Sequence, residues 1–538
     1  MKPGCEVIEV NFEELKALKE RARQGPLGEE DYRQLEATIE ALSRLIAMIG
    51  DKDTTISSLR ALLSKPTTEK TSKVLEQAGM GKTAKSSSSQ PASAGAAPKP
   101  GHGRNSAAAY RKARRIPVPH AGLTAGDRCP RCLKGKVYRQ KDPALRIRVI
   151  GQAPIEATVY ELERLRCNLC GDVFEAEAPE GVGEKKYDET AAAMIALLRY
   201  GSGVPFYRLE GLGASLGIPL PSSTQWEIVA GTAMEIHPAF DELIRQAAQG
   251  EVFYNDDTSM KILALAAARR AELKEASSSP DERTGMFTSG IVSTREGKRV
   301  ALFFTGWRHA GENFARVLAH RADGLSPPIQ MCDALSRNLP KLPKQLEILV
   351  GHCNAHARRH FVEVTANFPE ECRFVLESFG EVYGYDAQAE EQGLSAEERL
   401  RFHQRHSLPV MDELHAWLKT QIAEKKVEPN SGLGSAIAYA IRHWDRLTLF
   451  LRQAGAPLDS NIVERALKRT ILHRKNSLFY KTENGAEVGD LFMSLIHTCE
   501  LNGVNPFDYI TALQKHAAEL ARDPAAWMPW NYPAGQKP

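Results

Sequence analysis

The stretch VFYNDDTSMKIL, residues 252–263, decides how the centre of this chain folds. Three β-forming residues run into Asn255 and two acids, Asp256 and Asp257, and a second apolar segment follows. This pattern predicts a buried strand that ends in carboxylates. Such acids either mark the point where the chain turns out of the core or hold a bound group.

The segments that follow predict a mixed α/β sheet. Two further strands are expected in GMFTSGIVST (285–294) and RVALFFTG (299–306), a helix around GENFARVLAH (311–320), a fourth strand in PPIQMCDALS (327–336), and a fifth strand running into a helix in LEILVGHCNAHARRHF (346–361). This order is that of a ribonuclease-H-like domain, in which the first and fourth strands are neighbours at the centre of the sheet.

The two strands expected to be neighbours each end in an aspartate, Asp256 and Asp333. Two carboxylates that close repel each other when both are ionised, unless a cation lies between them. Magnesium prefers carboxylate and phosphate oxygens, and two such ions about 4 Å apart can activate the attacking oxygen and stabilise the leaving oxygen in phosphodiester cleavage. Two turn aspartates remain the alternative. We therefore expect a magnesium site here.

A third carboxylate is predicted beyond a helical block. Asp459 or Ser460 can cap a helix that contains Glu464, and from residue 461 to 481 six basic residues accompany this one acid. A salt bridge between Glu464 and Lys468 is the simple interpretation, whereas an isolated acid on a basic surface suits a metal ligand among phosphate contacts. The residues of this segment expected to bind DNA are Arg465, Lys468, Arg469, Arg474 and Lys475.

Two Cys-x-x-Cys pairs, Cys129 with Cys132 and Cys167 with Cys170, lie on strand-like sequence. Four thiolates satisfy tetrahedral zinc and leave no open position, so the pairs predict a structural zinc ribbon. A coincidence or a redox pair is the alternative. Farther on, His352, Cys353 and His356 suggest a second metal, but buried side chains beside the sheet are the preferred interpretation, with Arg358 and Arg359 as DNA contacts.

Charge is distributed unevenly, although the net charge is only +3. No acidic residue occurs between Glu76 and Asp127, where a linker too poor in apolar residues to fold precedes a basic arm. Such arms contact nucleic-acid backbone. The arm residues expected to bind DNA are Arg104, Arg111, Lys112, Arg114 and Arg115.

Other segments complete the organisation of the 538-residue chain. A heptad seam from Leu35 to Leu63 predicts a helix that self-associates, with packing on its own domain as the alternative. A helix, a glycine-containing turn and a helix opening at Ser222 outline a helix-turn-helix in which Gln225 faces a DNA groove. No apolar run reaches membrane-spanning length, and no signal peptide is evident, so a cytoplasmic protein without membrane contact is expected.

The chain resembles transposases of the insertion-sequence 66 family over nearly its whole length. Besides the heptad helix and the two cysteine pairs, the motifs that carry the resemblance are GHGR (101–104), NDDTSMKIL (255–263), MCDALSRN (331–338), CNAHARRHF (353–361), DSNIVERALKRTILHRKNSLFY (459–480) and SLIHTCELNGVNPFDYI (494–510). The resemblance implies an Asp-Asp-Glu transposase with a helical insertion before the glutamate.

The resemblance also implies the catalytic roles. Asp256, Asp333 and Glu464 would be the three catalytic metal ligands, for Mg²⁺ or Mn²⁺. Asp257 stands where the family usually has glutamate, and Ser460 stands in the middle of a usual Asp-Asn-Asn. The expected partners are the terminal inverted repeats of an element, target DNA and further copies of the chain, with room for small accessory proteins encoded beside it.

We therefore expect a multidomain α/β protein. Its expected regions are an N-terminal helix or coiled coil (1–65), a disordered basic linker and arm (66–118), a zinc ribbon (119–182), a helical, helix-turn-helix-like DNA-binding region (183–250), a ribonuclease-H-like catalytic domain (251–500) with a helical insertion at about 365–455, and a C-terminal helical tail (501–538). The expected activity is metal-dependent cleavage at element ends and strand transfer. A ribonuclease-H-like nuclease or recombination protein, or a zinc-ribbon DNA-binding regulator, is the alternative.

Overall fold

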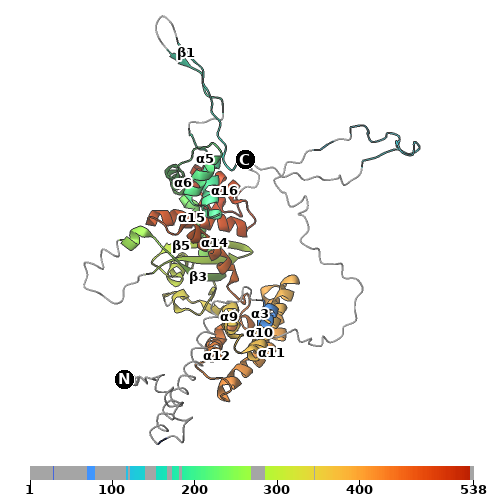
Figure 1. Cartoon of the computed structure of the whole chain (residues 1–538), viewed down its shortest axis with the longest axis vertical. Coiled ribbons are helices and arrows are strands. Elements are labelled where there is room, and N and C mark those ends of the chain that lie inside the picture. The colour runs from blue at the N-terminus through green and yellow to red at the C-terminus, as the bar shows by residue number, and fades with distance from the viewer. Residues whose placement is uncertain are drawn as a thin grey trace. The chain divides into compact units, whose positions relative to one another are not determined.

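Figure 1 shows a computed structural model of the chain. The structure describes residues 28, 70–78, 117–118, 121–139, 153–166, 173–180, 185–267, 285–343 and 346–532. These residues divide into two compact units, a large one that includes 181–212 and 219–538 and a small one that includes 84–180 and 213–218. The heptad segment 29–65, the arm 101–115 and the second cysteine pair lie outside the described residues.

A five-stranded mixed sheet forms the centre of the large unit, in the spatial order β5-β4-β3-β6-β7. Its strands are β3 (Val252–Met260), β4 (Met286–Arg295), β5 (Lys298–Gly306), β6 (Ile329–Cys332) and β7 (Leu349–His352). β3 pairs antiparallel with β4 and parallel with β6. The predicted central adjacency of the first and fourth strands is therefore confirmed.

The prediction that Asp256 ends the first strand is wrong. β3 continues to Met260 because β4 accompanies it over its whole length, from Val252 to Met260. The parallel ladder with β6, in contrast, stops at the pair Tyr254–Met331. Asp256 thus lies just beyond the point where β3 and β6 separate, and Asp333 follows the last residue of β6.

Alternating side chains of the sheet face different helices. Gly290, which pairs with Asp256, faces α14 (Asn461–Ser477), because a Cβ at this glycine would lie 2.9 Å from Leu467 Cδ2. Ser289 faces the opposite side, where it accepts a hydrogen bond from Asn313 of α8 (Ala310–Leu318) at 2.9 Å. Since side chains alternate along a strand, Asp256 lies on the α14 face and Asp257 on the α8 face.

Helix α15 (Glu483–Leu501) runs along the free edge of β5 and satisfies its outward amides. The N–H groups of Thr305, Phe303, Ala301 and Arg299 donate to Asp490 Oδ2 (2.6 Å), Ser494 Oγ (3.0 Å), Thr498 Oγ1 (3.0 Å) and Asn502 Oδ1 (3.1 Å), respectively. Every second residue of β5 thus donates a hydrogen bond to every fourth residue along α15 and its C-cap. The edge is thereby closed to pairing by another strand.

The chain between β7 and α14 forms a helical block. Its elements are α9 (Asn354–Val364), α10 (Pro369–Glu391), α11 (Ala396–Ala423), α12 (Gly432–Arg442), α13 (Trp444–Leu447) and η4 (Leu449–Leu451), and α9 to α12 gather beyond the sheet in Figure 1. Apolar side chains of these helices share one core, to which Val74 of α3 (Thr71–Gln77) also belongs. Part of the segment predicted as linker is therefore a packed helix.

Further helices lie in the segments 189–248 and 506–527. They are α4 (Glu189–Ala196), η2 (Leu197–Gly201), α5 (Phe206–Ser215), α6 (Ser222–Ala248), α16 (Pro506–Lys515), α17 (Ala517–Arg522) and η5 (Pro524–Trp527). Among them, α6 packs on β4 and β5. The prediction that Gln225 faces a DNA groove is wrong. Gln225 is buried, because its amide donates to the carbonyl oxygens of Leu220 at 2.8 Å and Phe206 at 3.1 Å. No described helix is long and apolar enough to cross a membrane.

Candidate active site

Asp256 and Asp333 share one hydrogen-bond donor. The buried side-chain amide of Asn338 donates to Asp256 Oδ1 at 3.3 Å and also to Asp333 Oδ1. The backbone carbonyl of Asn338 in turn accepts from Asn255 Nδ2 at 2.8 Å and Gln330 Nε2 at 2.7 Å. These bonds fix a short turn against β3 and β6, so the two predicted acids meet at one point.

The environment of Asp256 disfavours its charged form. Burial, followed by the nearby charge of Asp333, raises the pKa of Asp256 to about 6. The N–H groups of Asp257 and Asn338 oppose this rise by donating to the carboxylate. A divalent cation between the two carboxylates would neutralise both charges. It would attract both side chains, as the Asn338 side-chain amide does here. The donor set thus fits Mg²⁺ or Mn²⁺.

Asp257 forms ion-pair contacts on the opposite face of the sheet. Its side chain is 1% exposed and contacts His309 Nδ1 at 2.9 Å and Arg337 Nη2 at 3.2 Å. Arg337 precedes Asn338 in the turn η3 (Ser336–Asn338), so both neighbouring acids of β3 anchor this turn. The structure therefore separates the roles of the adjacent acids, with only Asp256 beside Asp333.

Glu464 lies in the first turn of α14, whose leading N–H, that of Asn461, donates to Asp459 Oδ1 at 3.0 Å. Its carboxylate contacts α9, with Oε1 3.6 Å from His356 Nδ1 and Oε2 3.6 Å from Arg359 Nη2. A hydrogen bond with Cys353 raises the pKa of His356 to about 9. Contacts with α9 thus take the place of the salt bridge to Lys468, which was the alternative interpretation.

Asp256 and Asp333 share the Asn338 amide, whereas Glu464 contacts His356 and Arg359 of α9. Among the described residues, the trio of potential metal ligands whose atoms all lie within 4.8 Å of one another is Cys353, His356 and Glu464. Glu464 nevertheless belongs to the helix that packs on the Asp256 face of β3 and β4. Asp256 and the helix that contains Glu464 therefore lie on the same face of the sheet, and the Glu464 carboxylate contacts α9.

The basic residues of α14 divide into two groups. Arg465, Lys468 and Lys475 are exposed on one side of the helix. Arg469 forms an ion pair with Glu500, and Arg474 donates to Thr258 Oγ1 at 3.1 Å and to Ser259. The first group is available to a ligand such as DNA phosphate, whereas the second group ties α14 to its neighbours.

The small unit contains the first cysteine pair. The Gly135 N–H donates to Cys132 Sγ at 3.5 Å, and the Cys129 N–H donates to the Gly135 carbonyl at 2.8 Å. The second pair would follow β1 (Arg164–Arg166), which pairs antiparallel with β2 (Val173–Glu175). An amide donated to sulfur in a tight turn fits a thiolate ligand of zinc. The zinc ribbon itself stays a prediction.

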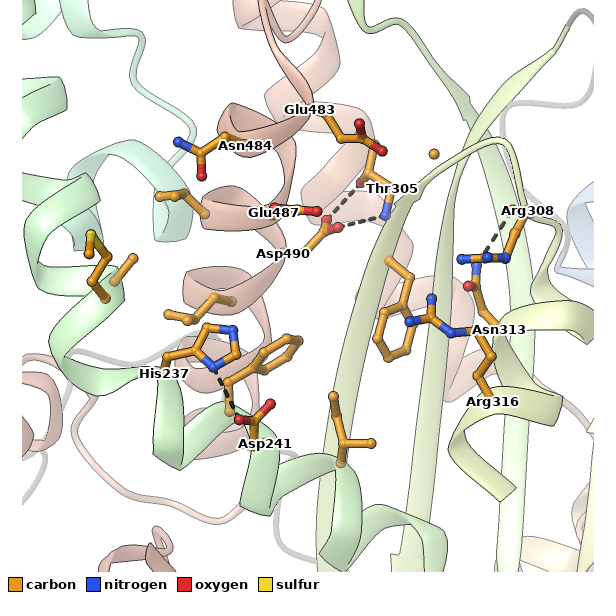
Figure 2. A pocket seen from close by; sticks show the side chains of 18 of the residues that line it. His237, Asp241, Thr305, Arg308, Asn313, Arg316, Glu483, Asn484, Glu487 and Asp490 are labelled. Atoms are coloured by element: carbon orange, nitrogen blue, oxygen red, sulfur yellow. Dashed lines mark hydrogen bonds and ion pairs between the residues drawn. The ribbon is translucent and has the colours of Figure 1, made fainter. Parts of the chain in front are cut away.

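A pocket of about 670 Å³ lies between α6, the end of β5 and the start of α15 (Figure 2). In Figure 2, Asp490 reaches from α15 to Thr305, and His237 contacts Asp241 on α6. Burial raises the pKa of Asp490 to about 7. The predicted catalytic acids do not line this pocket, so it is separate from the candidate active site.

Sequence reasoning missed two residues that contact the acids. Asn338 was not singled out, although it lies five positions after Asp333 in the quoted motif MCDALSRN. His356 was interpreted as a bystander of the sheet, because its contact with Glu464 joins two helices far apart in the chain. The one sequence signal for Asn338 was its position in the motif MCDALSRN, five residues after the predicted acid.

Comparison with known proteins identifies the family. The profile of the transposase IS66 family matches residues 185–488, and the chain therefore belongs to this family. It is similar to two uncharacterized proteins of Sinorhizobium fredii (strain NBRC 101917 / NGR234). It is 28% identical to y4jD over 69% of this chain and 72% of the relative, and 27% identical to y4qI over 64% and 62%. No solved structure matches the chain.

Proposed function

We propose that the chain is a DNA transposase that cuts phosphodiester bonds at the ends of a mobile element and joins the freed ends to target DNA. The main support is the convergence of Asp256 and Asp333 on the Asn338 amide, inside the region matched by a transposase family. The strand order, with the first and fourth strands as central neighbours, is the one expected of a ribonuclease-H-like nuclease.

Asp256, Asp333 and Glu464 would hold divalent magnesium or manganese. Bound ions of this kind neutralise charge that develops on phosphate and on the leaving oxygen, and lower the pKa of an attacking hydroxyl. The protein's own part is to orient the acids. Asn338 keeps the two aspartates together, and His356 and Arg359 position Glu464 at the start of α14.

The exposed basic residues of α14 would align the DNA backbone beside the acids. Arg465, Lys468 and Lys475 share the exposed side of the helix that contains Glu464. Contacts of this type supply affinity without base recognition and weaken as salt rises. The arm and the zinc ribbon, both proposed from the sequence, would add contacts outside the catalytic domain.

The decisive test replaces the glutamate by its neutral isostere. Glu464→Gln keeps the side-chain size and removes the charge, so strand cleavage and strand transfer in Mg²⁺ or Mn²⁺ should be lost, while DNA binding survives. The substrate is duplex DNA from the flanks of the gene, where matching inverted repeats define element ends. Glu487→Gln, at an exposed glutamate of α15, is the matched control. Cleavage by Glu464→Gln near the unchanged rate would contradict the assignment.

A second variant separates binding from chemistry. Lys468→Gln should weaken DNA binding and reduce its salt dependence, with some cleavage retained, because a phosphate contact is lost and no metal ligand is touched. Filter binding at several salt concentrations measures both quantities. An unchanged salt slope would show that this lysine does not contact DNA.

A further inference from the structure

Beside its place among the predicted catalytic acids, Glu464 belongs to a cluster of three different types of metal ligand. The Cys353 thiol, the His356 imidazole and the Glu464 carboxylate each offer a ligand atom, and these atoms lie within 4.8 Å of one another. The Cys353 N–H donates to the Cys332 carbonyl at 2.9 Å, so the cluster is fastened to the end of the strand that precedes Asp333.

Two helix starts build the cluster. Cys353 is the N-cap of α9, and His356 follows one turn later, so both side chains lie on the same side of that helix. Glu464 comes from the first turn of α14. The N–H of Ser460, the N-cap of α14, donates to Cys353 Sγ at 3.3 Å and so locks the two helix starts together. The backbone thus holds all three ligands.

Two polar atoms of the cluster lack a hydrogen-bond partner within the described residues. They are His356 Nδ1 and Glu464 Oε1, which are both buried and lie 3.6 Å apart. Arg359 approaches the other oxygen, Oε2, and leaves Oε1 to the cluster. A buried imidazole nitrogen and a buried carboxylate oxygen beside a thiol are satisfied either by a proton or by a cation between them.

The ligand chemistry selects the kind of cation. Thiolate with imidazole and carboxylate is a set typical of zinc, whose bonds of about 2.0–2.3 Å place tetrahedral ligands about 3.3–3.8 Å apart. A contraction of the order of 1 Å, within reach of side-chain rotation, would close the present arrangement onto an ion. Magnesium requires oxygen ligands and does not accept the thiol.

We propose that Cys353, His356 and Glu464 bind one zinc-class ion and leave its fourth position open. Binding releases the protons of the thiol and the imidazole to solvent and fixes Glu464 at α9. A consequence, which rests on the proposed function, is that zinc withholds this glutamate from Asp256 and Asp333 and inhibits magnesium-dependent cleavage.

Cobalt titration of the full-length protein tests the site without any need for activity. Co²⁺ bound to a thiolate gives a charge-transfer absorption, which Zn²⁺ abolishes on displacing it. Wild type should bind one equivalent more than Cys353→Ser or His356→Gln. Cys372→Ser, which alters a buried thiol in the helical block, and Cys129→Ser, in the predicted ribbon, should both keep the Cys353-dependent signal.

Each outcome of this titration decides the proposal. Equal numbers of cobalt equivalents in wild type and His356→Gln would overturn it, and melting curves of each variant establish that the comparison is between folded proteins. Because His356 is half-buried, its variant remains informative even where Cys353→Ser does not fold.

Cleavage assays test the inhibitory consequence separately. In Mg²⁺, the zinc concentration for half-inhibition should rise at least about tenfold in His356→Gln. Equal inhibition of both proteins would overturn the regulatory role and leave the metal site standing. If wild type cut no element-end DNA at all, the proposed function and the inhibitory role would fall together, whereas the cobalt count would still decide the site.

Discussion

Asn338 is the residue that allows two carboxylates to sit together before a metal arrives. Replacing it by alanine leaves Asp256 and Asp333 without their shared donor, which should lower the free energy of unfolding by about 1–3 kcal/mol in EDTA. Magnesium takes over the neutralising role, so the loss should be smaller in Mg²⁺. Urea melts in both conditions measure this difference.

A buried asparagine elsewhere is the matched control for that prediction. Asn313 donates to Ser289 on the opposite face of the sheet, so Asn313→Ala should cost the same with and without Mg²⁺. A magnesium-independent deficit for Asn338→Ala as well would argue against a cation between the two aspartates.

Single residues show where sequence reasoning succeeds and where it stops. Asp256 and Asp333 were predictable as neighbours because each ends an apolar run whose pairing follows from strand order. Gln225 was not, because a polar side chain at a helix start looks exposed in sequence, while here it satisfies two backbone carbonyls. Likewise, the partners of Glu464 depend on how α14 meets α9, and no local pattern encodes that meeting.

At the scale of elements, the close packing of α14 on β4 depends on the absence of a side chain at Gly290. A valine there would bring its Cβ to 2.9 Å from Leu467 Cδ2 and 3.3 Å from Val463 Cγ2, and would push the Glu464 helix outward. We expect Gly290→Val to cost about 1–3 kcal/mol and to reduce cleavage. Gly306→Val on β5, where a Cβ meets nothing within 4 Å, is the control. Full activity of Gly290→Val would show that this close packing of α14 on the sheet is not required for cleavage.

The contact between α15 and β5 should make stability depend on pH. Burial raises the pKa of Asp490 to about 7, whereas the unfolded chain titrates near 3.8. The folded state therefore keeps a proton that the unfolded state loses between these values. The stabilisation is fully present below about pH 4 and is lost as the pH rises to about 7.

Comparison with Asp490→Asn isolates this effect, because other titrating groups cancel. Over that window the free energy of unfolding of wild type should fall by a few kcal/mol relative to the variant, since one pKa unit corresponds to about 1.4 kcal/mol. Urea melts at several pH values between about 4 and about 7 measure it. A constant difference would mean that the Thr305 hydrogen bonds hold the carboxylate ionised throughout.

The elements themselves were largely predictable from periodicity. The five strands and the helix starting at Ser222 follow from alternation and from helix-start residues. Helix α11 continues through Pro409 without a break, because its other contacts compensate for the hydrogen bond lost there. Helix α3 was missed because its few apolar residues gain stability only against α10.

At the scale of the whole molecule, the proposed coiled coil predicts self-association. Light scattering should give the full chain a dimeric mass or more, and deletion of residues 1–65 should reduce it. Ile46→Asp, on the heptad seam, should dissociate the protein, whereas Ser43→Asp, off the seam, should not. An unchanged mass after deletion would place the interface elsewhere.

The hydrogen bonds between β5 and α15 repeat at slightly different intervals along the strand and along the helix. Two strand residues advance about 6.8 Å while four helix residues advance about 6.0 Å. Over the three intervals between the four bonds, this mismatch accumulates to about 2 Å, which tilt and strand twist absorb. A longer edge would fall out of step with the helix. A single helix can therefore cap a short strand such as β5, of nine residues, only in one register, and a slip by one helix residue would break all four bonds together.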